Sequence, residues 1–143
     1  MNTTSDSVRA ERGVSYDFSG QVVLVTGAAR GQGRSHALAF ARAGADVAIC
    51  DIAGHVDNLD YDMSQPDDLE QTADDIRTMG VECRAYPVDV RDEPAVARMV
   101  DDVAGALGRL DVLVNNAGVN AIHDSVDMPI EVWNTVLAIN LSG

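Results

Sequence analysis

The chain has 143 residues, of which 46% are apolar, and it carries a formal net charge of −13 at pH 7. This apolar content can form the core of one domain, and the acidic balance argues against nucleic acid or an anionic membrane as a partner. No run approaches the roughly 20 apolar residues of a membrane helix, so we expect a cytoplasmic protein. Residues 1–17 are predicted to form a disordered polar tail, and residues 18–143 one domain.

Predicted strands and helices alternate along the chain. Apolar runs predict strands over residues 21–26, 46–51, 82–88 and 110–115, and amphipathic patterns predict helices over residues 31–43, 66–79 and 94–107. Ser64 and Pro66 mark the predicted start of the second helix, and Asp92 is placed to cap the third. A fourth helix is predicted to begin near Pro129 and to continue through Gly143.

This alternation predicts an α/β fold, a Rossmann-type doubly wound parallel sheet with right-handed crossovers. The near-continuous apolar strands suit a sheet that is covered on both faces. We expect the strand order 3-2-1-4, and a fold truncated after strand four and the start of the fourth helix. The ligand crevice of such a sheet lies beyond the carboxyl ends of strands one and four.

A glycine-rich turn, Thr-Gly-Ala-Ala-Arg-Gly-Gln-Gly at residues 26–33, joins the first strand to the first helix. Gly27 lets the chain leave the strand in a tight turn, and Gly31 leaves room for a pyrophosphate beside the backbone. Gly33 lets the helix pack close to the strand. Together with Gln32 and the free N–H groups at the start of the helix, this turn is the predicted diphosphate site.

Asp51, followed by Ile52, ends the second strand 18 residues after Gly33. A carboxylate at this place can accept hydrogen bonds from both ribose hydroxyls of an adenosine and would repel a 2′-phosphate, which favours NAD over NADP. Arg30, in the glycine-rich turn, is the competing signal, because it could neutralise a 2′-phosphate. The structural alternative for Asp51 is a solvated aspartate in a turn.

Two further polar motifs follow strands three and four. Asp89 could accept a hydrogen bond from the adenine amino group while Val90 packs on the ring, although an aspartate that caps the following turn is an equal alternative. Asn115-Asn116-Ala117-Gly118 ends strand four. The small residues there leave room for a ribose and nicotinamide, and the asparagine pair can tie strand four to its neighbours, but Asn and Gly are also ordinary turn residues.

Asn140 lies on the fourth predicted helix, on one face with Trp133, Val136 and Leu137. An amide on an otherwise apolar face must find partners if it is buried. The functional interpretation is a relay residue that holds a water near a proton donor. The alternative is a core asparagine that bonds to nearby backbone.

Residues 52–65 form a long connection that contains Asp57, Asp60 and Asp62. A calcium loop is excluded because the required glycine and terminal glutamate are missing. A solvated acidic loop and a flap over the adenosine end of a cofactor remain open. The sequence indicates no metal site, and Cys50 and Cys83 are expected to be buried free thiols.

Together these residues resemble the short-chain dehydrogenase/reductase family, through the turn at 26–33, Asp51, Asp89-Val90, residues 115–118 and Asn140. Residues 27–37 and 51–72 resemble its mycofactocin-coupled, carveol-dehydrogenase-like branch. The resemblance implies NAD held tightly under the extra loop and a secondary alcohol or ketone as substrate. It also implies a redox partner for the bound cofactor and a homo-oligomeric full-length form.

The family mechanism uses Asn, Ser, Tyr and Lys, and the resemblance assigns only the first of these, as Asn140. The chain contains no lysine, so it has no Tyr-x-x-x-Lys motif. We therefore expect an N-terminal, cofactor-binding part that is inactive alone. The alternative is a non-catalytic dinucleotide-binding or partner-binding module. An acidic signalling receiver is a third class, but it would need a lysine near its last strand.

Overall fold

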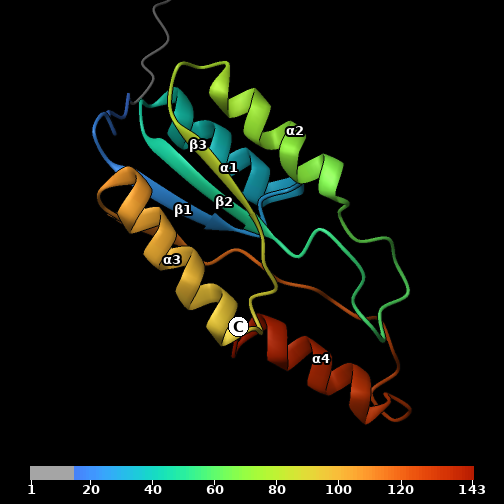
Figure 1. Cartoon of the computed structure of the whole chain (residues 1–143). Coiled ribbons are helices and arrows are strands. Elements are labelled where there is room, and N and C mark those ends of the chain that lie inside the picture. The colour runs from blue at the N-terminus through green and yellow to red at the C-terminus, as the bar shows by residue number, and fades with distance from the viewer. Residues whose placement is uncertain (1–14) are drawn as a thin grey trace, which may run out of the picture.

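A computed structural model describes residues 15–143 of the chain (Figure 1). The elements that it contains are β1 (Val22–Thr26), α1 (Gly31–Arg42), β2 (Asp46–Asp51), α2 (Pro66–Arg77), β3 (Cys83–Pro87), α3 (Glu93–Leu107), β4 (Val112–Val114) and α4 (Ile130–Asn140). Most of the predicted tail lies outside the described residues, and the domain boundary at residue 18 stays a prediction.

The strands form one parallel sheet in the order β3-β2-β1-β4 within the described residues. This confirms the predicted fold class and strand order. Val23 of β1 lies opposite Val47 of β2 on one side and Val112 of β4 on the other. The carboxyl ends of β1, β2 and β4 therefore lie next to one another, which is where a doubly wound sheet binds its ligands.

Helices cover both faces of the sheet (Figure 1). Alternate residues of a strand point to opposite faces, so Val23 and Val25 pack with α1 and α2, whereas Val22 and Leu24 pack with α3. All five residues of β1 are buried. This two-sided burial explains why the central strands have near-continuous apolar sequences.

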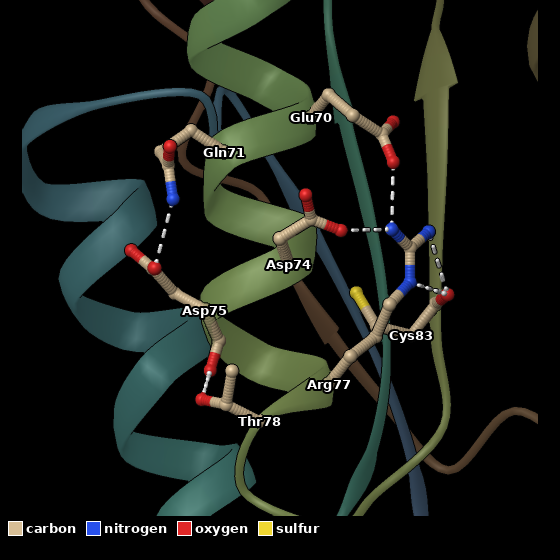
Figure 2. A network of polar contacts seen from close by, with 7 residues as sticks. All are labelled: Glu70, Gln71, Asp74, Asp75, Arg77, Thr78 and Cys83. Atoms are coloured by element: carbon tan, nitrogen blue, oxygen red, sulfur yellow. Dashed lines mark hydrogen bonds and ion pairs between the residues drawn. The ribbon is translucent and has the colours of Figure 1, made fainter.

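The free edge of β3 is tied to α2 by an arginine (Figure 2). The Arg77 guanidinium donates to the carboxylates of Glu70 and Asp74 on its own helix at 2.6 and 2.8 Å. It also donates twice to the backbone carbonyl of Cys83, at 3.3 Å. These contacts satisfy a carbonyl at the start of the edge strand and fix α2 against it.

Two predicted element ends are corrected by the structure. α4 ends at Asn140 rather than continuing through Gly143: the N–H groups of Leu141 and Ser142 both donate to the Leu137 carbonyl, so the i→i−4 pattern of the helix is lost at Ser142. The N-cap of α2 is Gln65, whose N–H donates to Asp68, so Ser64 lies one residue too early to begin the helix. Asp92 caps α3 as predicted, by accepting from the Ala95 N–H.

The apolar face of α4 that the sequence groups with Asn140 is only partly buried, through Val136. Trp133 is 52% exposed and Leu137 is 37% exposed, and Asn140 is exposed as well. The helix instead buries Val132 and Ile139, the second of which packs with the loop after β2. The buried stripe of Val132, Val136 and Ile139 therefore overlaps the predicted face at Val136 and is set by the contact with that loop.

The remaining global predictions concern the thiols and the membrane. Cys50 and Cys83 are both free and buried, as expected. Burial raises the pKa of each thiol to about 12. Among the described residues, every helix is too short or too polar to cross a membrane.

Candidate functional site

A pocket of about 310 Å³ lies at the carboxyl ends of β1, β2 and β4. Its lining includes most of the residues predicted to bind a cofactor. These are Gly27, Arg30, Gln32, Gly33, Asp51, Ile52, Asp89, Val90, Asn116, Ala117 and Gly118. Gly31 and Asn140 were also predicted site residues, but they do not line this pocket. The structure therefore brings together residues that are up to 91 positions apart in the sequence.

The glycine-rich turn has the geometry that its sequence predicts. Gly27 has φ +65° and Gly31 has φ +60°, values at which side chains are strained. A β-carbon at Gly27 would lie 2.8 Å from the Ala117 Cα. α1 begins at Gly31, so the free N–H groups of its first turn lie at this end of the sheet.

Asn116 fastens the end of β4 to the glycine-rich turn. Its amide donates to the carbonyls of Thr26 and Gly27 at 2.8 and 3.1 Å. The Thr26 hydroxyl in turn accepts from the N–H groups of Asn116 and Ala117 at 3.0 and 2.9 Å. The predicted tie between the strands is thus made by Asn116, which also holds the backbone of Ala117 at the pocket wall.

Asp51 is buried at the end of β2, with 9% of its surface exposed, so the alternative of a solvated turn aspartate is wrong. Its Oδ2 accepts from the Ala29 N–H at 3.0 Å. Its Oδ1 accepts from the Ala53 N–H at 3.2 Å and from the Ser64 hydroxyl at 2.5 Å. These three donors stabilise the carboxylate and fix its orientation in the pocket wall.

Sequence reasoning missed the role of Ser64 and Thr72. Both are buried, with 2% and 0% of their surfaces exposed. Thr72 donates to the Ala29 carbonyl at 2.9 Å, so this hydrogen bond connects α2 to the glycine-rich turn. The signal available for Thr72 was its place among the apolar residues of α2, whereas the sequence indicates Ser64 only as a mark of the helix start.

The loop of residues 52–65 lies over the pocket with its apolar residues inward. Val56 and Leu59 are buried with Val119 and Ile139, while Asp57, Asp60 and Asp62 are exposed. Val56, Tyr61, Met63 and Ser64 line the pocket. The loop is therefore a packed wall with a solvated acidic outer side. Figure 1 shows this loop and α4 at the same end of the molecule.

Two hydrogen bonds connect this loop to the surrounding segments, in addition to those that Ala53 and Ser64 donate to Asp51. The Arg30 guanidinium donates to the Asp62 carbonyl at 2.6 Å. The Asn120 N–H donates to the Tyr61 hydroxyl oxygen at 3.3 Å. Arg30 is the residue that could favour NADP by neutralising a 2′-phosphate, and its guanidinium is hydrogen-bonded to this loop.

Asp89 lines the pocket and also caps its own turn. Its carboxylate accepts from the Arg91 N–H at 2.9 Å and from the Arg91 guanidinium. Hydrogen bonds from the Arg91 guanidinium are the main cause that lowers the pKa of Asp89 below its usual value. Asp89 therefore does cap its turn, and both Asp89 and Val90 still line the pocket.

Asn140 bonds to nearby backbone, as its structural alternative predicts, but the residue is exposed and does not lie in the core. Its amide donates to the Val119 carbonyl and its Oδ1 accepts from the Val119 N–H, both at 2.8 Å. This pair of bonds fixes the segment after Gly118 against the end of α4. A relay role for Asn140 stays a prediction. The structure groups no metal-binding set of His, Cys, Asp and Glu side chains within residues 15–143.

Comparison with known proteins gives the relatives of this arrangement. The family described as short chain dehydrogenase matches residues 21–143. The (−)-trans-carveol dehydrogenase of Rhodococcus erythropolis is 42% identical over 125 residues, which cover 87% of this chain and 45% of that protein.

Two solved structures are similar in fold and sequence. Carveol dehydrogenase from Mycobacterium avium in complex with NAD has a TM-score of 0.86 and 41% identity, over 90% of this chain and 47% of that one. A short chain dehydrogenase from Mycobacterium paratuberculosis bound to NAD has a TM-score of 0.86 and 42% identity, over 88% and 47%. The chain thus spans about half the length of these relatives.

Proposed function

The chain belongs to the short-chain dehydrogenase family, and from that membership we propose that it is the N-terminal, cofactor-binding part of an NAD-dependent oxidoreductase. The carveol dehydrogenases among its relatives support a secondary alcohol or ketone as the substrate of the complete enzyme. A redox partner and a homo-oligomeric full-length form stay predictions.

One observation carries this proposal: a buried acceptor carboxylate and a glycine-rich turn face the same pocket. Asp51 would accept from the adenosine ribose, and Gly27, Gly31, Gln32 and Gly33 would hold the pyrophosphate at the start of α1. A β-carbon at Gly33 would lie 2.1 Å from the Gly27 carbonyl oxygen, so this cradle depends on glycine. The donors and the acceptor present fit a dinucleotide.

Pocket residues are also available for the adenine and for the nicotinamide ribose of the dinucleotide. Asp89 and Val90 would contact the adenine, with Ile52 beside it, and Asn116, Ala117 and Gly118 would line the nicotinamide ribose. When bound, the nicotinamide ring supplies the hydride donor or acceptor. The Asn140 amide would act on the nicotinamide side by fixing the backbone of Val119.

The preference for NAD is supported by charge. Asp51 would repel the dianionic 2′-phosphate of NADP in a buried setting where screening is weak. Arg30, which could offset that repulsion, donates to the Asp62 carbonyl instead. Both contacts favour a free ribose 2′-hydroxyl.

The proposal also includes catalytic inactivity of these 143 residues alone. Proton transfer in the family uses a Tyr-x-x-x-Lys pair, and the sequence contains no lysine. The same observation supports the second candidate, a module that binds a dinucleotide without catalysis. The intact mass of the native polypeptide distinguishes the two: a mass well above 15.2 kDa supports the enzyme, and 15.2 kDa supports the module.

Calorimetric titration of the chain with NAD and NADP tests the binding proposal. We expect one NAD per chain and weaker binding of NADP. Absence of NAD binding would refute the proposal, and tighter NADP binding would refute the assignment of Asp51. Incubation with NAD and carveol tests inactivity, and the appearance of NADH absorbance would contradict it.

A further inference from the structure

Ser64 lies where the loop after β2 meets the pocket and the buried carboxylate. Its side chain lines the pocket, and only 2% of the residue is exposed. Its hydroxyl is 2.5 Å from Asp51 Oδ1. An ionised carboxylate can only accept, so the Ser64 proton is committed to Asp51, while the lone pairs of the Ser64 oxygen stay available as acceptors.

The carboxylate of Asp51 is nearly saturated by the protein itself. A carboxylate offers about four acceptor positions, two on each oxygen. Oδ1 already accepts from Ser64 and from the Ala53 N–H, and Oδ2 accepts from the Ala29 N–H. This count leaves one position, on Oδ2, although an adenosine ribose offers two hydroxyl donors.

We propose that Ser64 supplies the second acceptor, so that the adenosine ribose donates one hydroxyl to Asp51 Oδ2 and the other to Ser64 Oγ. The inference rests on the proposed NAD binding and adds a specificity-determining residue to that site. The loop of residues 52–65 thereby takes part in ribose recognition directly, rather than only covering the pocket.

The same geometry disfavours a 2′-phosphate a second time. A phosphate oxygen accepts hydrogen bonds, and a free serine hydroxyl would donate to it. Because the Ser64 proton is held by Asp51, this hydroxyl has no proton to offer a phosphate. Ser64 and Asp51 therefore act as a pair that requires hydroxyl donors from the ligand.

The test compares NAD with 2′-deoxy-NAD and 3′-deoxy-NAD (on the adenosine ribose) by calorimetry, in the wild-type chain and in Ser64→Ala. We expect wild type to lose affinity for both analogues, by about tenfold each, as for the loss of one hydrogen bond. In Ser64→Ala, NAD should bind about tenfold more weakly, and one of the two analogues should bind nearly as well as NAD.

A purely structural role gives a different result. In that case Ser64→Ala weakens NAD and both analogues by the same factor, and this outcome would overturn the inference. Wild-type affinity that is unaffected by removal of either hydroxyl would also overturn it, and this arm needs no variant. If wild type binds no NAD at all, the proposed function fails first.

Two further variants guard against misfolding. Ser64→Cys keeps the buried volume but replaces the oxygen with a weak acceptor, and we expect it to give the same ratio change as Ser64→Ala. Ser125→Ala makes the same substitution at an exposed loop position, and we expect wild-type affinity for all three ligands. A Ser64→Cys variant that folds and keeps the wild-type ratios would contradict the proposal.

Discussion

Gly33 and Gly27 approach each other so closely that a β-carbon at Gly33 would lie 2.1 Å from the Gly27 carbonyl oxygen. The Asn116 amide nitrogen would lie 2.6 Å from the same β-carbon and closes the other side. The start of α1, the glycine-rich turn and the end of β4 thus share one contact point, and the pocket is built around it.

Gly33→Ala should therefore disrupt both stability and ligand binding. We expect a loss of roughly 3 kcal/mol in the free energy of unfolding, because backbone atoms must move to admit the methyl group. Gly105→Ala, in α3, is the matched control. Its β-carbon would meet nothing within 4 Å, and we expect a gain of about 0.5–1 kcal/mol. Urea unfolding measures the change in the free energy of unfolding for each variant. Equal changes in the two variants would contradict the close approach of Gly33 and Gly27.

Asn116→Ala should destabilise the chain, because it removes the link between the end of β4 and the glycine-rich turn. Two carbonyls, those of Thr26 and Gly27, lose their donor. We expect a loss of about 1–3 kcal/mol on urea unfolding. Asn120→Ala, at an exposed position, should unfold like wild type. Similar losses in both variants would show that the tie at Asn116 is unimportant.

Asp51→Asn should change the choice of cofactor. It removes the negative charge and one acceptor oxygen, so we expect NAD affinity to fall about tenfold or more and the preference for NAD over NADP to shrink. Asp60→Asn removes the same charge from an exposed position of the neighbouring loop, and NAD affinity should not change. Calorimetry gives the dissociation constants of both cofactors for each variant. An unchanged preference for NAD over NADP in Asp51→Asn would contradict the role of Asp51 in cofactor choice.

The two thiols should be unreactive in the folded chain. Burial raises the pKa of Cys50 and of Cys83 to about 12, so the reactive thiolate is scarce at pH 8. We expect no reaction with a disulfide reagent under native conditions and reaction of both thiols in denaturant. A thiol that reacts rapidly in the native chain would show that its strand is accessible.

The Asp89–Arg91 pair should contribute to acid sensitivity. The pKa of Asp89 is lowered in the folded state. The stabilisation by this carboxylate is therefore present above the unfolded pKa and is lost as the pH falls through the folded pKa. Asp89→Asn should be less stable than wild type at pH 7, and the difference between the two stability curves should shrink as the pH falls below the unfolded carboxyl pKa of about 3.9 and on through the lower folded value. A constant difference between them down to pH 2 would exclude this linkage.

The order of elements could be predicted because it depends on local patterns. Apolar runs such as that of β1 are buried on both faces, and the strand order followed from the βα alternation. The position of the pocket then followed from the topology. This is why Gly27, Asp51 and Asn116, which are far apart in sequence, were correctly expected to lie together.

Side-chain partners depended on contacts that no local pattern encodes. α4 carries two adjacent apolar stripes, and the stripe with Ile139 is buried because the loop after β2 packs against it. From the sequence, Ser64 marks only the start of the second helix, since serine is common there. Its bond to Asp51, 13 positions away, depends on how that loop folds back.

A crystal structure of the chain with bound NAD would give the distances from the adenosine ribose hydroxyls to Asp51. We expect the pyrophosphate at the start of α1 and a ribose hydroxyl within about 3.2 Å of the Asp51 carboxylate. An adenosine that binds elsewhere, or a ribose without contact to Asp51, would contradict this expectation.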